Sequence, residues 1–374
     1  MVNWAIVVGI NQYPARAQQN TLNGAVADAC DFAEWALDPA GGNVAPERLF
    51  FWTHPWPAPS PGRLGSYLAG PLPNWYHEQL GAAQPSPTRA PMAFEITTTI
   101  EDAGRAAYAS DYGNDATERR VFVFLAGHGI RARTSERNEE TCFLAGDFAP
   151  PRGNLTPGLL PCDSFRKALL HKRFSEAILF TDCCRSTTAR SSLTARQVSD
   201  FDGDPVLPWS MAFAAQDGQP AYETGTAPIR GAFSSALMRG LRTHRPGPVG
   251  DLHADPLRDY VQASIQDFTD SGQMPNLLYR PDPRGPLIVP GQQAGGGTVV
   301  NAPTLDVSGL ALGTVLVLKG GDLQPFQGVG PFTVAGPSVV LPPLPVGLYA
   351  VEINDGSGRY TMFAQPSKGA VRVE

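Results

Sequence analysis

Short apolar runs alternate with helix-like stretches over the first three quarters of the chain. WAIVVG at 4–9, LFFWT at 49–53, VFVFL at 121–125 and AILFT at 177–181 have the length and β-type character of strands buried on both faces. Further strands are expected at 142–146 and 211–215, and helices at 22–37, 100–110, 163–170, 232–241 and 256–268. This alternation predicts an α/β fold with a mostly parallel sheet flanked by helices.

Proline interrupts this pattern at 54–94, where HPWPAPSPG, GPLPNWY and AAQPSPTRAP follow one another. Such proline density excludes a long helix or a central strand, so we interpret the segment as an insertion at the surface. After it, Thr97–Thr99 are expected to cap the helix that begins at residue 100.

The pattern changes again near 281–297, where PDPRGP and GQQAGGG have the composition of a flexible linker. Beyond it, short β-type segments alternate with Gly, Pro and Asp turns every eight to twelve residues, which is typical of a small sandwich. The sequence therefore predicts an α/β domain at 1–290, a linker at 291–297 and an all-β, immunoglobulin-like sandwich at 298–374.

Charge and cysteine usage narrow the class of protein. The 374 residues include 29 Lys and Arg against 35 Asp and Glu, a net charge of −6 without a basic run. This balance argues against nucleic acid or an anionic membrane as a partner. Five cysteines, two of them adjacent, form no disulfide framework and indicate a reducing compartment. Since the chain also lacks a signal-peptide pattern and a membrane-spanning apolar run, we expect a soluble cytoplasmic protein.

Two strand ends carry the residues best suited to chemistry. His128 follows the run at 121–125, between Gly127 and Gly129, and Cys184 follows the run at 177–181. If the two strands are parallel neighbours, both side chains emerge at one edge of the sheet, where active sites of such sheets lie. A thiol needs a nearby base to act as a nucleophile, and the Gly129 N–H could stabilise a developing oxyanion.

The segments around these residues resemble the caspase-like cysteine proteases, and the metacaspase and orthocaspase branch of microbes more than animal caspases. FLAGHG resembles the histidine motif and LFTDCCRS the cysteine motif, with Cys184 in the position of the nucleophile. The similarity extends in order over residues 4–290, interrupted mainly at 54–94. Supporting segments are WAIVVGINQY, LNGAVADA, MAFAAQDGQPAYE, GAFSSALMRGL and QMPNLL.

The resemblance implies an endopeptidase whose partners are protein or peptide substrates. Cys184 would attack the scissile carbonyl, and His128 would protonate the leaving amine and then activate water. The backbone N–H groups of Gly129 and Cys184 would hold the oxyanion. Microbial relatives act in regulated cell death, stress responses or phage defence, which implies a role of that kind here.

The resemblance also implies a preference for basic substrates. In metacaspases, acids at the positions of Asp28 and Asp182 line a pocket for Arg or Lys, and carboxylates pair well with a guanidinium. Asp217 and Glu223 are further candidates for this pocket. The alternative interpretation is structural, with Asp28 as a solvated helix residue and Asp182 as the cap of the following turn.

Residues 185–204 form a polar segment that repeats Thr-Ala-Arg. The corresponding loop of the family is often cut during maturation, so Arg190 and Arg196 are hypothetical processing sites, used by the enzyme itself or by an upstream protease. An ordinary mobile loop is the alternative. Cleavage in this loop of a protein that carries both Arg190→Ala and Arg196→Ala would contradict the hypothesis.

Other chemistries find less support in the sequence. No zinc-type spacing or phosphate-binding glycine loop is present, and no cofactor is expected. Glu139-Glu140, an adjacent acidic pair between the two motifs, does not clearly match the calcium-binding pattern of metacaspases. Cys184-x5-Arg190 also fits the loop of a cysteine phosphatase, although that loop usually contains glycine. A catalytically silent binding scaffold is the third possibility.

Overall fold

The computed structural model describes most of the chain in eighteen ranges. They are residues 1–13, 21–58, 61–70, 89–110, 118–134, 138–149, 155–172, 174–185, 193–198, 205–225, 227–247, 250–280, 285–290, 302–320, 323–326, 329–344, 347–365 and 370–373. They group into two compact units. The first comprises residues 1–235 and 273–286, and the second comprises residues 236–272 and 287–374.

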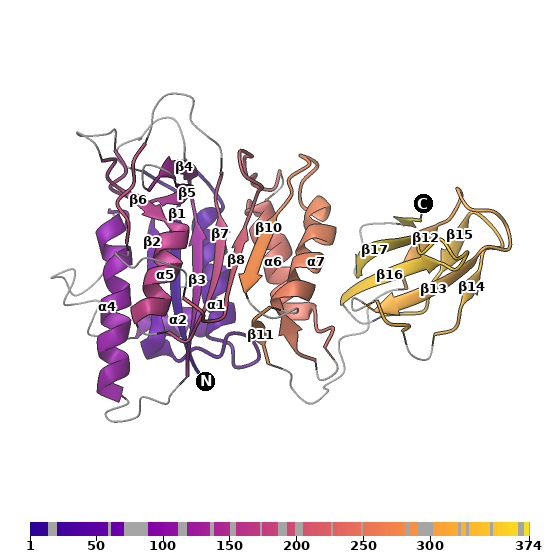
Figure 1. Ribbon diagram of the computed structural model, residues 1–374, viewed down its shortest axis with the longest axis horizontal. Helices are drawn as coiled ribbons and strands as arrows, with labels where there is room; N and C mark the ends of the chain where they lie inside the picture. Colours follow the sequence, from indigo (N-terminus) through magenta and orange to yellow (C-terminus); the bar gives the residue numbers. More distant parts are fainter. Residues whose placement is uncertain are drawn as a thin grey trace. The chain divides into compact units, whose positions relative to one another are not determined.

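A six-stranded sheet forms the centre of the first unit (Figure 1). Its strand order is β10-β8-β7-β3-β1-β2, and every neighbouring pair is parallel except β10 with β8. The predicted mostly parallel α/β sheet is thus confirmed. The strands are β1 (Val2–Ile10), β2 (Leu49–His54), β3 (Arg119–Ala126), β7 (Glu176–Asp182), β8 (Trp209–Phe213) and β10 (Asn276–Arg280).

Helices cover both faces of this sheet, because the central strands are apolar on both sides. In β3, Val121, Val123 and Leu125 pack on the face that carries α4 and α5, whereas Phe122 and Phe124 face the opposite way. The rings of Phe32 in α1 and Phe124 stack there with centroids 4.6 Å apart. The helices of this unit are α1 (Ala25–Ala36), η2 (Pro46–Arg48), α2 (Arg63–Ala69), α4 (Ala93–Ser110) and α5 (Cys162–Lys172).

The expected start of α4 was wrong. The helix begins at Ala93, so Thr97–Thr99 lie inside it and their hydroxyls donate to carbonyls three residues earlier. Its first turn is instead capped by carboxylates, since the Met92 N–H donates to Glu95 Oε2 at 2.8 Å and the Ala93 N–H to Asp147 Oδ1 at 2.8 Å. The Asp147 contact spans 54 residues, which local sequence signals do not reveal.

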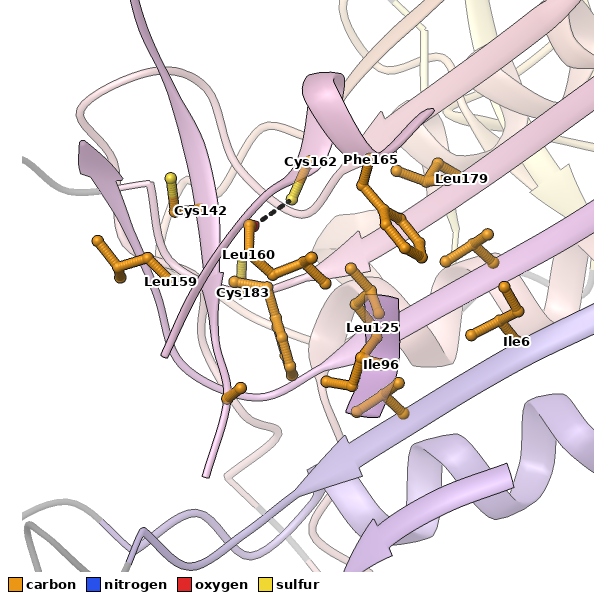
Figure 2. Packing of buried hydrophobic residues seen from close by; sticks show 14 of the residues in the cluster. Ile6, Ile96, Leu125, Cys142, Leu159, Leu160, Cys162, Phe165, Leu179 and Cys183 are labelled. Atoms are coloured by element: carbon orange, nitrogen blue, oxygen red, sulfur yellow. Dashed lines mark hydrogen bonds between the residues drawn. The ribbon is translucent and has the colours of Figure 1, made fainter. Parts of the chain in front are cut away.

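A small antiparallel sheet lies over the apolar face that carries α5. It consists of β4 (Gly129–Arg133), β5 (Glu139–Leu144) and β6 (Leu159–Pro161), in that order. Figure 2 shows Cys142, Leu159 and Leu160 from this sheet beside Cys162 and Phe165 of α5. The strand predicted at 142–146 therefore exists, but it belongs to this second sheet and not to the central one.

Within its described residues, the proline-rich insertion contributes the short helix α2 and, at its end, the first two residues of α4. Its Tyr67 side chain is buried, and the Tyr67 hydroxyl donates to the Leu49 carbonyl at 3.0 Å. Residues 59–60 and 71–88 lie outside the residues that the structure describes. Between its boundary residues, which end β2 and begin α4, the described part agrees with the prediction that this segment contains no long helix or central strand.

The second unit combines a helical part with β-sheets. The helix α6 (Ala232–Thr243) begins in the first unit and continues into the second, which also contains α7 (Ala254–Ser264) and η3 (Ile265–Asp267). The strands β9 (Leu252–His253) and β11 (Leu287–Val289) pair with each other. The predicted linker at 291–297 lies outside the described residues, so the proposed domain boundaries stay a prediction.

The C-terminal strands form the expected all-β structure from two sheets, in the orders β15-β12-β18 and β14-β13-β16-β17. Leu305 of the first sheet shares one buried apolar core with Leu316, Leu318 and Val351 of the second. The strands are β12 (Thr304–Asp306), β13 (Val315–Gly320), β14 (Phe332–Thr333), β15 (Ser338–Val340), β16 (Gly347–Ile353), β17 (Tyr360–Gln365) and β18 (Val371–Arg372). No helix within the described ranges has the length and apolar character that a bilayer crossing needs.

Candidate active site

The strands that precede His128 and Cys184 are hydrogen-bonded neighbours. β3 and β7 run parallel, and Ala126 at the end of β3 is paired with Asp182 at the end of β7. Just beyond the sheet, the Gly127 N–H donates to the Asp182 carbonyl at 3.1 Å. The expectation that both segments leave the same edge of the sheet is therefore confirmed.

Gly129 packs directly against the cysteine segment. A Cβ atom added at Gly129 would lie 2.3 Å from Cys183 Sγ and 2.6 Å from the Cys184 carbonyl oxygen, so any larger residue would push the segments apart. Cys183 itself is buried in the apolar core beneath the site, near Leu160 (Figure 2). The two motifs, 56 residues apart in the sequence, are thus in van der Waals contact.

The direction of the Gly129 N–H follows from the ladder between β4 and β5. The Leu144 N–H donates to the His128 carbonyl at 2.9 Å, and the next pair in register is Gly129 with Phe143. Because hydrogen-bonded and non-hydrogen-bonded pairs alternate in antiparallel sheets, the Gly129 N–H points away from β5. It thus points toward the outer side of β4, which is the direction that a donor to an oxyanion bound there would need.

The Cys184 thiol is half-buried beside the backbone of Ala221. The Ala221 N–H donates to Sγ at 3.4 Å, and the thiol donates to the Ala221 carbonyl at 3.7 Å. Burial raises the pKa of Cys184 above its usual range, and the Ala221 N–H only partly offsets this effect. The resting group is therefore a neutral thiol, and nucleophilic attack requires a base that takes its proton.

The segment that carries Ala221 is held firmly against the cysteine motif. The Arg185 N–H donates to the Gln219 carbonyl at 3.0 Å, and the Gly218 N–H donates to the Arg185 carbonyl at 3.1 Å. Gln273 adds a bridge, because its Nε2 donates to the Ala214 carbonyl at 2.8 Å and its Oε1 accepts the Tyr222 N–H at 3.0 Å. These bonds fix the backbone beside the thiol from both sides.

Asp217 is engaged with two arginines of this region. Its carboxylate pairs with Arg131 at 2.6 Å and with the guanidinium of Arg185. Arg185 also donates to Thr141 Oγ1 at 2.8 Å and lies over the Phe213 ring, 4.2 Å from its centroid. In the described structure Asp217 thus ties β4 to the cysteine segment.

Tyr13 contacts His128 directly, although it belongs to neither of the two motifs that predict the site. Its hydroxyl accepts the His128 backbone N–H at 2.8 Å, and its ring centroid lies 5.0 Å from that of the imidazole. Tyr13 is buried at 5% exposure, on the segment that follows β1. Tyr13 is the last residue of the WAIVVGINQY segment, after a strand of the central sheet. This position was the signal in the sequence that could have identified it as a site residue.

Asp28, Asp182 and Glu223 gather around Arg230 and Gly231. Asp28 Oδ2 accepts the Gly231 N–H at 2.7 Å, and a Cβ atom added at Gly231 would lie 2.0 Å from Asp182 Oδ2 and 3.1 Å from Asp28 Oδ2. Glu223 Oε1 accepts the Gly24 N–H at 2.5 Å. A Cβ atom added at Gly24 would lie 3.0 Å from the same oxygen. Three of the four predicted pocket acids therefore lie in one cluster, which we call the acidic cluster.

Burial controls the protonation of this acidic cluster. Asp28 and Asp182 are 1% and 8% exposed. Burial, reinforced by repulsion from Asp182, raises the pKa of Asp28 to about 7. Burial also raises the pKa of Asp182 to about 6, although hydrogen bonds from the Ser234 hydroxyl and N–H lower it. A bound cation would favour the ionised form of both groups.

A comparison with protein families agrees with this geometry. Residues 2–281 match the model of the caspase domain, which is three quarters of the chain. The chain belongs to the caspase-domain family, a family of cysteine peptidases. The recognition made from the FLAGHG and LFTDCCRS motifs is thereby confirmed at the level of the family.

Two individual proteins illustrate the likeness. A probable protease from a Desulfuromonadales bacterium is 30% identical over 247 residues, which cover 65% of this chain and 26% of that relative. The chain thus spans about a quarter of the length of that protease. The crystal structure of caspase-1 from Spodoptera frugiperda is similar with a TM-score of 0.38 and 13% identity, over 74% of this chain and 85% of that one.

Of the two candidate processing sites of this caspase domain, the structure describes Arg196 but not Arg190. Arg190 lies outside the described residues, so neither its role as a cleavage site nor the phosphatase-like Cys184-x5-Arg190 loop gains structural support. Arg196 is exposed, but its neighbours are docked. The Arg133 N–H donates to the Leu193 carbonyl at 2.8 Å, and the Thr156 N–H to the Thr194 carbonyl at 2.8 Å.

The acidic pair Glu139-Glu140 is engaged with other groups of the protein. Glu139 lies 3.9 Å from Arg131 and 3.8 Å from Arg133. Glu140 Oε2 accepts the N–H groups of Asp163 and Ser164 at the start of α5, at 2.9 and 3.0 Å. Over the ranges that the structure describes, no group of three or more His, Cys, Asp or Glu residues is arranged to hold a metal ion.

Proposed function

We propose that this caspase-domain protein is a cysteine endopeptidase that uses a Cys184–His128 dyad and cleaves after Arg or Lys. The observation that carries the proposal is the contact between the two motifs, in which Gly129 packs against Cys183 and the Cys184 carbonyl. The Gly127–Asp182 hydrogen bond supports the same juxtaposition. A positional library of peptides, assayed with the wild type and the Cys184→Ala variant, tests both the activity and the preference.

The proposed reaction is acyl transfer in two stages. Cys184 Sγ attacks the scissile carbonyl carbon while His128 accepts the thiol proton, and the N–H groups of Gly129 and Cys184 stabilise the oxyanion. His128 then gives the proton to the leaving amine, so the C–N bond breaks and a thioester remains. Water attacks the thioester with His128 as the base, and the returning proton regenerates the Cys184 thiol.

The acidic cluster supports the preference for a basic side chain before the cleaved bond. Asp182 directly precedes Cys183 and Cys184 in the chain, so its carboxylate lies close to the nucleophile segment. Burial makes its charge costly in the absence of a cation, and a guanidinium or ammonium would offset that cost. An Asp-directed enzyme would instead need an excess of positive charge here, whereas the carboxylates of the acidic cluster outnumber Arg230.

The raised pKa values predict a pH-dependent affinity for basic peptides. As the pH falls through about 7 and 6, Asp28 and Asp182 become neutral and lose their attraction for a cation. We expect the Kd of a peptide ending in Arg for the Cys184→Ala protein to rise by at least about tenfold between pH 8 and pH 5.5. Isothermal titration with the matched citrulline peptide is the control, because its binding should change little over the same range.

We expect Tyr13→Phe to lower kcat by about threefold to tenfold while KM stays nearly constant. The phenylalanine keeps the ring beside the imidazole but removes the acceptor of the His128 N–H, so the histidine becomes less well positioned. A shift in the pH profile of kcat/KM should accompany the loss. Tyr67→Phe is the matched control, since Tyr67 is also a buried tyrosine whose hydroxyl bonds to backbone. An unchanged kcat and pH profile would exclude the positioning role.

The remaining elements of the proposal follow from the likeness to microbial relatives of the family. They are a metacaspase-like branch, maturation from a zymogen by cleavage at Arg190 or Arg196, an activating protease upstream, and a cytoplasmic role in regulated cell death or defence. Support for processing comes from the polar segment 185–204 and the exposure of Arg196.

A further inference from the structure

The guanidinium of Arg230 already occupies the carboxylates that a basic substrate would need. Arg230 Nε donates to Asp28 Oδ1 at 2.5 Å, and its Nη2 donates to Asp31 Oδ2 at 2.7 Å. The other oxygen of Asp28 accepts the Gly231 N–H. Both oxygens of this buried carboxylate are therefore engaged, and an incoming guanidinium cannot form a bidentate pair with Asp28 while Arg230 stays in place.

The backbone around Arg230 is held independently of this ion pair. The Thr224 N–H donates to the Arg230 carbonyl at 2.6 Å, and the Arg230 N–H donates to Thr224 Oγ1 at 3.1 Å. Glu223 and Gly231 form a β-bridge on the same turn. Because the Arg230 side chain is 22% exposed, it can rotate toward solvent while its backbone stays bonded.

We propose that Arg230 is a specificity-determining residue, an internal cation that a substrate Arg or Lys side chain must displace from Asp28. The proposal rests on the Arg- or Lys-directed activity proposed above. Displacement exchanges one cation for another, so no buried carboxylate is left unpaired. A neutral side chain that displaced Arg230 would leave the buried Asp28 carboxylate without a cationic partner, which is energetically costly. Arg230 thus selects against neutral side chains and lowers the apparent affinity for basic ones.

The charge balance of the region favours this exchange. Asp28 and Asp31 bind the guanidinium of Arg230, while Asp182 and Glu223 lie beside the neighbouring Gly231 and Gly24. Among the described residues of this region the carboxylates thus outnumber Arg230, and this excess attracts a second cation. A Cβ atom added at Gly231 would lie close to both Asp182 Oδ2 and Asp28 Oδ2, so the two carboxylates lie beside each other, and Asp182 Oδ2 accepts the Ser234 N–H. An incoming cation can therefore contact Asp182 while it competes with Arg230 for Asp28.

The test compares the wild type with Arg230→Gln, using a peptide ending in Arg-aminomethylcoumarin and the competitive probe benzamidine. We expect KM and the inhibition constant of benzamidine to fall by about threefold to tenfold, with kcat within about twofold. Asp31→Asn is a second variant, which keeps Asp28 and Arg230 but weakens the hold on the guanidinium. It should shift both constants in the same direction by a smaller factor.

Arg239→Gln is the matched control, because Arg239 is also a partly buried arginine paired with an aspartate, Asp267. It should leave both constants unchanged. If Arg230→Gln raises KM and the inhibition constant of benzamidine, or leaves them unchanged, Arg230 is not a displaced cation. If Arg230→Gln does not fold, the Asp31→Asn variant is judged by the same criterion. A wild type without preference for Arg or Lys would instead contradict the proposed function, before any variant is compared.

Discussion

Replacement of Cys184 by alanine should lower peptidase activity by at least about 1,000-fold, because it removes the thiol that would form the thioester. The Cys184 Sγ lies beside the Ala221 backbone, and its replacement by a methyl group removes only two weak sulfur hydrogen bonds. The variant should therefore fold normally. The measurement is kcat/KM with a fluorogenic Arg peptide, together with the melting temperature.

Cys183→Ala is the matched control, since it changes the neighbouring residue in the same way. Cys183 is 1% exposed and packs below Gly129 in the apolar core, so its loss should reduce stability but keep most of the activity. His128→Ala should resemble Cys184→Ala, because the thiol would lose its base. Full activity of Cys184→Ala, or loss of activity only in Cys183→Ala, would contradict the assignment of the nucleophile.

Asp182→Asn should lower kcat/KM for Arg peptides by about 100-fold, because it removes a charge from the acidic cluster at constant size. The Ser234 hydroxyl and N–H can still donate to the amide oxygen, so the start of α6 should remain intact. The measured quantity is the ratio of kcat/KM between an Arg peptide and the corresponding citrulline peptide, which isolates the charge of the substrate.

Asp217→Asn is the comparison variant for this second prediction. Its carboxylate pairs with Arg131 and Arg185, so its removal can affect overall activity through the backbone beside the thiol. The preference for Arg over citrulline should nevertheless remain. If Asp182→Asn keeps the wild-type ratio of Arg to citrulline cleavage, the acidic cluster does not select the substrate.

The sequence was sufficient to predict five strands of the central sheet, because these strands contain continuous apolar runs. The edge strand β10 was not predicted, since it lacks such a run and only its second residue is buried. Buried strands such as β3 and β7 need apolar residues on both faces, and this requirement is visible in VFVFL and AILFT. The start of α4 was not visible, because the group that caps Ala93 is the distant Asp147. The position of β5 in a separate sheet likewise depends on its pairing with β4 and β6.

The sequence also placed His128 and Cys184 at one edge of the sheet, since parallel strands end on the same side. It could not reveal contacts that depend on long-range packing. Tyr13 and His128 are 115 residues apart, and Asp28 and Arg230 are 202 residues apart. Asp217 met the chemical criterion for the pocket, but the structure pairs it with two arginines. Residue type thus suggested the candidates, and tertiary packing determined their partners.

The docking of the segment after the nucleophile affects how a cleaved form would behave during purification. A cut within 186–192 would leave a new amino terminus ahead of Leu193, whose carbonyl still accepts the Arg133 N–H. The Ala195 N–H would still donate to Arg133, and the Val198 N–H to Ser164 Oγ. Because Leu193 and Ala195 are also buried, the two fragments should co-elute in size-exclusion chromatography and separate only under denaturing electrophoresis.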